Sequence, residues 1–209
     1  MRTVLVTQRL AEETAYPEVR EALDARWGRF FRALDLLPVP MSQEIDPSEY
    51  VALDPALVVL TGGNDVAAVT TSKLSHQRDV YERRVLAVAD AHGWPIFAVC
   101  RGLQLLSVDA GATLHEVSDH VACEHGLTAV PGAPFAPLLG NVHRVNSFHR
   151  WAPAGALRGG WMVSAHGDDG GIEAIAHDSR RALAVMWHPE RYDTPRPCDL
   201  ALVRAVVAS

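Results

Sequence analysis

The sequence predicts an α/β fold with a doubly wound, largely parallel sheet and helices on both of its faces. Apolar runs without alternation at residues 57–60 and 95–100 are typical of parallel strands buried on both sides. A helix-type pattern follows each run, over residues 75–93 and 101–111. This succession of strands and helices predicts the doubly wound architecture.

The N-terminal part is predicted as a strand, a helix and a short extended piece. Residues 3–10 form a β-rich opening run, and residues 36–41 are an extended piece limited by prolines. Between them, residues 16–34 carry apolar side chains at helix-like spacing, beginning at Val19. A helix is therefore expected across this segment.

The helix predicted over residues 75–93 is amphipathic. Val80, Val85 and Val88 are expected to face the core, and Gly93 is expected to follow the helix C-terminus.

The pattern changes in the second half of the chain. Residues 113–178 are rich in glycine and histidine and contain short β pieces, which favours an antiparallel excursion from the parallel sheet. Residues 182–188 return to the core, and residues 198–208 close the chain as a helix. We expect one domain spanning residues 1–209.

Composition excludes several classes of protein. The chain is 48% hydrophobic and carries a net charge of −6, so a nucleic-acid partner is not expected. No apolar run approaches the length of a bilayer span, and residues 1–10 resemble a strand rather than a leader, so no membrane partner is expected. Three cysteines are too few for a disulfide framework and favour the cytoplasm. A homodimer is left open.

Cys100 stands at the junction of a predicted strand and a predicted helix, in "PIFAVCRGLQLLS". A buried structural cysteine is one interpretation, because free cysteine behaves as a small hydrophobe. The other is a nucleophile held on a sharp strand-to-helix turn. In an open parallel sheet, functional groups gather at such strand ends.

The segment "MWHPE" ends another predicted strand and supplies the partners that a thiol nucleophile needs. His188 and Glu190 are two residues apart, so they share one face if the strand continues. A carboxylate there orients a histidine, and the histidine exchanges a proton with the Cys100 thiol and with a leaving nitrogen.

Two backbone N–H groups are candidates for an oxyanion hole. One belongs to Arg101, which follows the thiol, and the other comes from the turn at Gly62 and Gly63. Gly102 permits close backbone approach at the turn. Taken alone, "TGG" is an ordinary turn and "WHPE" is a strand ended by proline.

Together these motifs resemble the class I glutamine amidotransferase fold, and more narrowly its γ-glutamyl hydrolase branch, the peptidase C26 proteins. The matching segments are "LTGGND", "RDVYE", "PIFAVCRGLQLLSVDAGATLH", "VNSFH", "GIEAIAH" and "MWHPE". The resemblance implies a flavodoxin-like sheet and a γ-glutamyl thioester on Cys100, with His188 and Glu190 completing a triad. It also implies an oxyanion hole from Gly63 and Arg101.

The same resemblance implies how the substrate is held. It assigns recognition of a small-molecule γ-glutamyl substrate to Gln104 and to residues 146–149, among them Asn146, Ser147 and His149. It implies no cofactor.

Further segments are similar to the γ-glutamyl-CDP-amidate hydrolases of capsular phosphoramidate pathways, which release glutamate and cytidine diphosphoramidate. They are "TQRL…YPEVREALDARWGRFF", "DHVACEHGL" and "GIEAIAHDSRRALAVMWHPER". Arg9 follows the first strand, so we expect it to bind a diphosphate leaving group. The alternative is a solvated arginine.

Three other functions remain open at this point. The chain is alternatively a γ-glutamyl-aminobutyrate-type hydrolase, a glutaminase subunit that supplies ammonia to a synthase, or a catalytically silent binding module. The presence of Cys100, His188 and Glu190 argues against the last.

The histidines His115, His120 and His125, close to Cys123 and Glu124, suggest a zinc site. Their spacing of five places them on no common face of a helix or strand, so we expect no metal. A loop at the border of the active site explains these residues, with His120 or His125 contacting substrate.

A dense run of charges lies in the predicted helix at residues 78–84. Arg83 and Arg84 are expected on a solvated face, with an Asp79–Arg83 pair. Asp79 and Glu82 match the hydrolase branch but receive no role.

Overall fold

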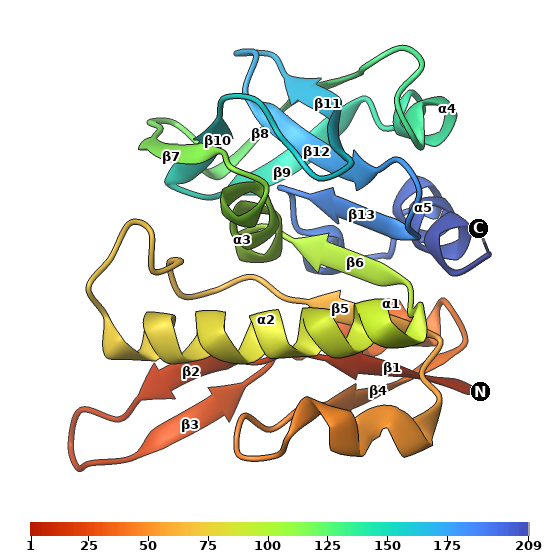
Figure 1. Ribbon diagram of the computed structural model, residues 1–209. Coiled ribbons are helices and arrows are strands. Elements are labelled where there is room, and N and C mark those ends of the chain that lie inside the picture. The colour runs from red at the N-terminus through yellow and green to blue at the C-terminus, as the bar shows by residue number, and fades with distance from the viewer. Residues whose placement is uncertain (209) are drawn as a thin grey trace.

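The computed structural model describes residues 1–208, which form a nine-stranded mixed sheet with helices packed against it (Figure 1). The first five strands across the sheet run parallel to one another and the other four are antiparallel to their neighbours. Across the sheet the strands are β4 (Leu36–Pro40), β1 (Arg2–Val6), β5 (Leu57–Leu60), β6 (Ile96–Val99), β13 (Ala182–Val185), β12 (Ile172–His177), β11 (Trp161–Gly167), β8 (Val121–Ala129) and β9 (Arg144–Phe148).

Helices connect the parallel strands, and two small two-stranded sheets complete the fold. Figure 1 shows α2 and α3 in front of the sheet and α1 behind it. The helices are α1 (Arg26–Arg32), α2 (Lys73–His92), α3 (Arg101–Asp109), α4 (Ala136–Leu139) and α5 (Pro197–Ala208), with short 3-10 turns η1 (Pro47–Leu53) and η2 (Pro189–Arg191). The small sheets pair β2 (Arg9–Glu12) with β3 (Val19–Ala22), and β7 (Thr113–Glu116) with β10 (Trp151–Ala154).

The predicted doubly wound, largely parallel sheet with an antiparallel excursion is confirmed. Every residue of β5, β6 and β13 is buried, as continuous apolar runs in a covered parallel sheet should be. The antiparallel strands β12, β11, β8 and β9 extend the sheet from the edge of β13. No helix within residues 1–208 combines the length and the apolar character that crossing a membrane requires.

The helix predicted over residues 16–34 is wrong in its first half. Residues 9–12 and 19–22 pair instead as the antiparallel hairpin β2–β3, and the helix begins only at Arg26. Val19, which was expected to start the apolar face of the helix, is half exposed. The Asp24 carboxylate accepts a hydrogen bond from the Arg26 backbone N–H at 2.9 Å, which favours a helix start at this point.

One inward position of α2 was also predicted wrongly. Val80 is 60% exposed, whereas Arg78 and Glu82 are fully buried on the face that was expected to be apolar. Arg83 and Arg84 are exposed as predicted, and Arg83 forms the predicted pair with Asp79 at 3.8 Å. Helix α2 therefore packs a charged surface, not an apolar one, against part of the protein interior.

Four strand ends of the parallel sheet meet at one rim. Cys100 directly follows β6, and Gly62, His188 and Arg9 lie just beyond the ends of β5, β13 and β1. Because these strands run parallel, their carboxyl ends face the same side, which is where open α/β sheets bind ligands.

Gly102 fixes how closely the turn after β6 approaches the sheet. A Cβ atom at this position would lie 2.9 Å from both the Cβ and the carbonyl oxygen of Leu60, and 3.0 Å from the Cβ of Ala98. Helix α3 can begin here only because residue 102 has no side chain.

We predict that Gly102→Ala lowers the free energy of unfolding by about 1–3 kcal/mol, the usual cost of overpacking. The matched control is Gly28→Ala in α1, where a Cβ meets nothing within 4 Å. Alanine there should raise stability by roughly 0.5–1 kcal/mol. Urea unfolding of both variants tests this, and equal stability of the two would contradict the packing described at Leu60.

Candidate active site

Cys100 lies on a strained turn between β6 and α3. Its backbone has φ 52° and ψ −102°, an arrangement that costs a non-glycine residue about 1–3 kcal/mol. Its N–H donates to the Val185 carbonyl at 2.8 Å, and its carbonyl accepts from the Gln104 N–H at 3.0 Å. The turn is thus held by β13 on one side and by the first turn of α3 on the other.

His188 and Glu190 form a buried pair next to this turn. Nδ1 of His188 lies 2.7 Å from Oε1 of Glu190, and the two residues are 2% and 3% exposed. Burial lowers the pKa of His188, but the charges of Glu190 and Cys100 outweigh this effect and raise it to about 9. The imidazole therefore favours its charged form beside the thiol.

The glycine turn after β5 touches both groups. A Cβ atom on Gly62 would lie 2.6 Å from Cε1 of His188 and 3.5 Å from the Cβ of Cys100. Gly63 follows with φ +84°. The three predicted motifs therefore converge on one spot, with Gly62 between the thiol residue and the imidazole.

A hollow of about 240 Å³ opens beside this spot. Its wall includes Gly63, His188 and Glu190 together with Arg9, whose side chain packs over Gly63. The Arg9 guanidinium forms no ion pair within residues 1–208. The structure thus brings the predicted Arg9 to the same rim as the histidine and its carboxylate.

Two further residues of this wall were missed by the sequence analysis. Trp27 lines the hollow from α1, and Arg191 lines it from η2. The Arg191 guanidinium lies 4.3 Å from the centroid of the Phe148 ring, and that ring meets the His188 ring edge-on at 5.8 Å. The sequence could have indicated Arg191 as a site residue, because it directly follows Glu190 in the chain.

Beneath the glycine turn, Arg78 is fully buried and holds the backbone carbonyls of three successive residues. Its Nη2 donates to Thr61 O at 2.7 Å, and its Nη1 donates to Gly62 O and Gly63 O at 3.0 Å each. In a trans peptide the carbonyl and the next N–H point in opposite directions. Arg78 therefore turns the N–H of Gly63 away from itself.

Glu82 joins this arginine to the turn that carries the thiol. Its carboxylate accepts from Arg78 Nε at 3.0 Å and also pairs with the guanidinium of Arg101. Arg101 pairs in addition with Asp79. Burial raises the pKa of Glu82, but the charges of Arg101 and Arg78 hold it below its usual value. Asp79 and Glu82 thus link α2 to both loops of the site.

Three of the residues expected to recognise the γ-glutamyl group, Gln104, Asn146 and Ser147, are buried and their side chains form hydrogen bonds within the protein. Gln104 donates to Trp151 O at 2.8 Å, and Ser147 Oγ donates to His120 O at 2.8 Å. Asn146 donates to His188 O at 2.9 Å and accepts from His188 N at 2.8 Å. None of these three side chains lines the hollow beside His188.

The prediction that spacing keeps the histidines apart is wrong for His120 and His125. With His149 and Glu173 they form a cluster whose metal-binding atoms all lie within 4.8 Å of one another. The register of β8 against β9 shifts between Val121 and Cys123, and this irregularity breaks the regular spacing that was assumed. The remaining candidates lie elsewhere: His115 is in β7, Cys123 donates to Asp119 O, and Glu124 is exposed.

The fold and the strand-end groups together define a class I glutamine amidotransferase-like α/β protein. A solved glutamine amidotransferase from Thermotoga maritima shares the fold with a TM-score of 0.65 and 16% identity, over 90% of this chain and 76% of that one. The peptidase C26 family matches residues 9–190. The chain therefore belongs to the peptidase C26 family and is a hydrolase.

Two curated relatives carry specific names. The chain is 32% identical over 190 residues to the gamma-glutamyl-CDP-amidate hydrolase of Campylobacter jejuni, covering 89% of this chain and 88% of that one. It is 31% identical over 134 residues to the gamma-glutamyl-gamma-aminobutyrate hydrolase of Escherichia coli K12, covering 54% of this chain and 52% of that one.

Removing the shared charge of the buried network should destabilise the whole protein. We predict that Glu82→Gln lowers the free energy of unfolding by about 3–5 kcal/mol, because it leaves buried guanidinium charge uncompensated. The control is Asp90→Asn, which removes the exposed Asp90–Arg180 pair and should cost less than about 1 kcal/mol. Chemical denaturation measures both, and a Glu82→Gln protein as stable as the control would contradict this role.

Proposed function

We propose that the chain is a cysteine-dependent γ-glutamyl hydrolase. It would act as a single catalytic domain, through a γ-glutamyl thioester on Cys100. The buried His188–Glu190 pair at 2.7 Å, placed across Gly62 from Cys100, is the observation that carries this proposal. A thiol, an imidazole and an orienting carboxylate in this order are the groups that acyl transfer by a cysteine requires.

The proposed reaction has two halves. The Cys100 thiolate attacks the γ-carbonyl carbon, and the N–H groups of Gly63 and Arg101 stabilise the oxyanion. The C–N bond then breaks as the His188 imidazolium gives its proton to the leaving nitrogen. In the second half, water attacks the thioester while His188 takes its proton. Glutamate leaves and the thiolate is restored.

We further propose that the substrate is γ-glutamyl-CDP-amidate, which gives glutamate and cytidine diphosphoramidate. The wall of the hollow supplies two guanidinium groups, from Arg9 and Arg191, on the side where the leaving group departs. Guanidinium groups bind diphosphate oxygens in a bidentate manner. The name of the Campylobacter jejuni relative supports the same choice. This reaction would serve capsular phosphoramidate synthesis in the cytoplasm.

The γ-glutamyl end of the substrate is proposed to lie toward α3 and β9. Gln104 and the segment with Asn146, Ser147 and His149 are the proposed contacts. Asn146 also acts on His188 directly, because its amide group makes two hydrogen bonds to the His188 backbone.

A γ-glutamyl-aminobutyrate hydrolase is the second candidate, and the Escherichia coli relative favours it. The decisive experiment offers the purified chain γ-glutamyl-CDP-amidate, γ-glutamyl-aminobutyrate and glutamine, and identifies products by mass spectrometry. We expect the highest kcat/KM with γ-glutamyl-CDP-amidate. A preference for either phosphate-free compound would overturn the nucleotide assignment, and no turnover of any of the three would overturn the hydrolase proposal.

Arg9→Ala should weaken turnover of the nucleotide substrate selectively. Loss of one charge-assisted hydrogen bond costs about 1–3 kcal/mol, which corresponds to a drop in kcat/KM of roughly 5- to 150-fold. Glutamine turnover should change little, since its leaving group has no phosphate. Arg32→Ala in α1, an exposed arginine outside the hollow, is the matched control. Equal losses of Arg9→Ala on both substrates would place Arg9 in a structural role.

The pH profile should report the charge of His188. Because its pKa is raised to about 9, the imidazolium that protonates the leaving nitrogen is lost above that pH, and kcat should fall there. The folded-state pKa exceeds the unfolded one, so its contribution to stability is complete below about pH 6.5 and disappears as the pH rises through 9.

Glu190→Gln removes a charge that raises this pKa, so the alkaline limb of its kcat profile should move to lower pH. Stopped assays across the pH range compare the two proteins. An alkaline limb at the same pH in both would contradict the proposed pairing.

A further inference from the structure

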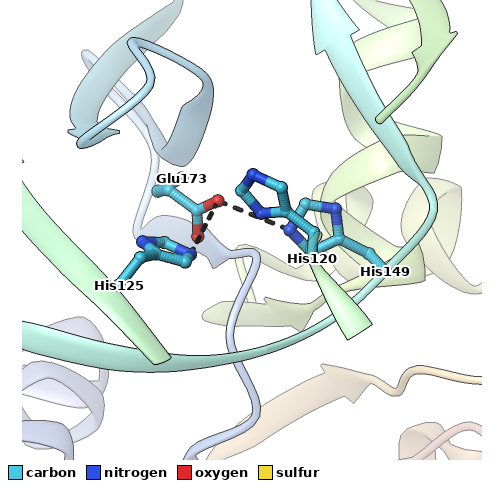
Figure 2. Close-up of side chains that lie close together, drawn as sticks. All are labelled: His120, His125, His149 and Glu173. Atoms are coloured by element: carbon cyan, nitrogen blue, oxygen red, sulfur yellow. Dashed lines mark ion pairs between the residues drawn. The ribbon is translucent and has the colours of Figure 1, made fainter. Parts of the chain in front are cut away.

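Four side chains from the antiparallel half of the sheet converge in a cluster that does not line the hollow beside His188 (Figure 2). His125 belongs to β8 and Glu173 to β12, while His120 precedes β8 and His149 follows β9. Figure 2 shows the rings of His125 and His149 directed at the Glu173 carboxylate from two sides.

The cluster contains buried polar atoms that have no hydrogen-bond partner. They are Nε2 of His125, both ring nitrogens of His149 and Oε2 of Glu173. His149 is 4% exposed and Glu173 is 1% exposed, so water does not readily satisfy them. Leaving a buried polar atom without a partner is unfavourable, and several such atoms in one place indicate that they share a partner.

The distances within the cluster suit a metal ion better than direct hydrogen bonds. Nε2 of His125 lies 3.6 Å from Oε1 of Glu173, and Nε2 of His149 lies 3.5 Å from the same oxygen. Two ligands of a tetrahedral zinc ion with bonds of 2.0–2.1 Å lie about 3.3 Å apart. Small shifts of the side chains are enough to bring these atoms onto one ion.

The orientation of His125 is already that of a metal ligand. Its Nδ1 lies 2.9 Å from the Gly126 carbonyl oxygen and donates to it, which leaves the lone pair of Nε2 facing the cluster. Metal-binding histidines commonly have their other nitrogen held in this way. His120 differs, because its nitrogens lie 3.2 Å from Ser147 Oγ and 3.0 Å from Asp169 Oδ2. His120 would become the fourth ligand by exchanging one of these two contacts for the ion.

We propose that His125, His149 and Glu173 bind a zinc ion, with His120 completing a tetrahedral site. Imidazole-rich sets with one carboxylate suit borderline divalent ions such as Zn²⁺, whereas Mg²⁺ and Ca²⁺ prefer oxygen ligands. A divalent cation also compensates the buried Glu173 carboxylate. His149 is then a metal ligand and not a contact of the γ-glutamyl group.

The ion would act on the active site through β9. By binding His125, Glu173 and His149, the ion would link strands β8 and β12 to His149, the residue that directly follows β9. Within β9, Asn146 makes two hydrogen bonds to the His188 backbone and Phe148 contacts the His188 ring. Zinc therefore positions His188 without touching the reacting atoms. The metal site does not depend on which γ-glutamyl compound is hydrolysed.

The test uses the full-length chain, stripped with a chelator and then titrated with Zn²⁺ against a competing chromophoric chelator. We expect one zinc per chain, and a higher melting temperature with zinc than without it. His149→Ala and Glu173→Gln should each weaken zinc binding more than about 100-fold, beyond the 10- to 100-fold typical of changes around the ligands.

His166→Ala is the matched control, because His166 lies in β11 and bonds only to Gly170 O nearby. It should bind zinc as the wild type does. Should a variant fold poorly, Co²⁺ bound to the wild type provides an independent readout through its visible absorption, which a tetrahedral nitrogen and oxygen site makes intense. Absence of stoichiometric zinc in the wild type, or undiminished binding in folded His149→Ala and Glu173→Gln, would overturn the proposal.

Discussion

A buried group of charges between α2, α3 and the loop after β5 is the interaction on which the site depends. Arg78 and Arg101 share the Glu82 carboxylate, and Arg78 also holds the carbonyls of Gly62 and Gly63. Separating either arginine from Glu82 would leave a buried charge without a partner. The network therefore holds the loop after β5 and the turn between β6 and α3 in fixed positions relative to each other. One segment carries the nucleophile candidate, and the other carries the N–H group proposed to face it. Rigid placement of both is what stabilisation of an oxyanion requires.

Much of the fold and of this site could be predicted from the sequence. Continuous apolar runs predicted β5, β6 and β13, because a strand covered on both faces has no polar side to alternate with. Parallel strands place their carboxyl ends on one rim. The placement of Cys100, His188, the glycine turn and Arg9 at one rim could therefore be expected from the predicted strand ends, and the family resemblance added the pairing of Cys100 with His188 and Glu190.

The other features of the fold and site could not be predicted, because they depend on tertiary contacts that the local sequence pattern does not encode. Residues 19–22 belong to an apolar spacing that also fits a helix, and only their pairing with residues 9–12 makes them the strand β3. The burial of Arg78 and Glu82 could not be predicted because a charged run is normally a solvated helix face. Likewise, His149 and Glu173 join His125 only through the order of strands β9, β8, β11 and β12 in the sheet.

The proposed reaction requires that Cys100 becomes acylated. The most direct measurement is intact-mass spectrometry of the protein quenched during turnover of a slowly hydrolysed γ-glutamyl substrate, followed by peptide mapping. We predict a γ-glutamyl adduct on the peptide that contains Cys100 and on neither Cys123 nor Cys198, with no adduct in Cys100→Ala. Turnover at the wild-type rate by Cys100→Ala, or an adduct confined to another residue, would contradict the central claim.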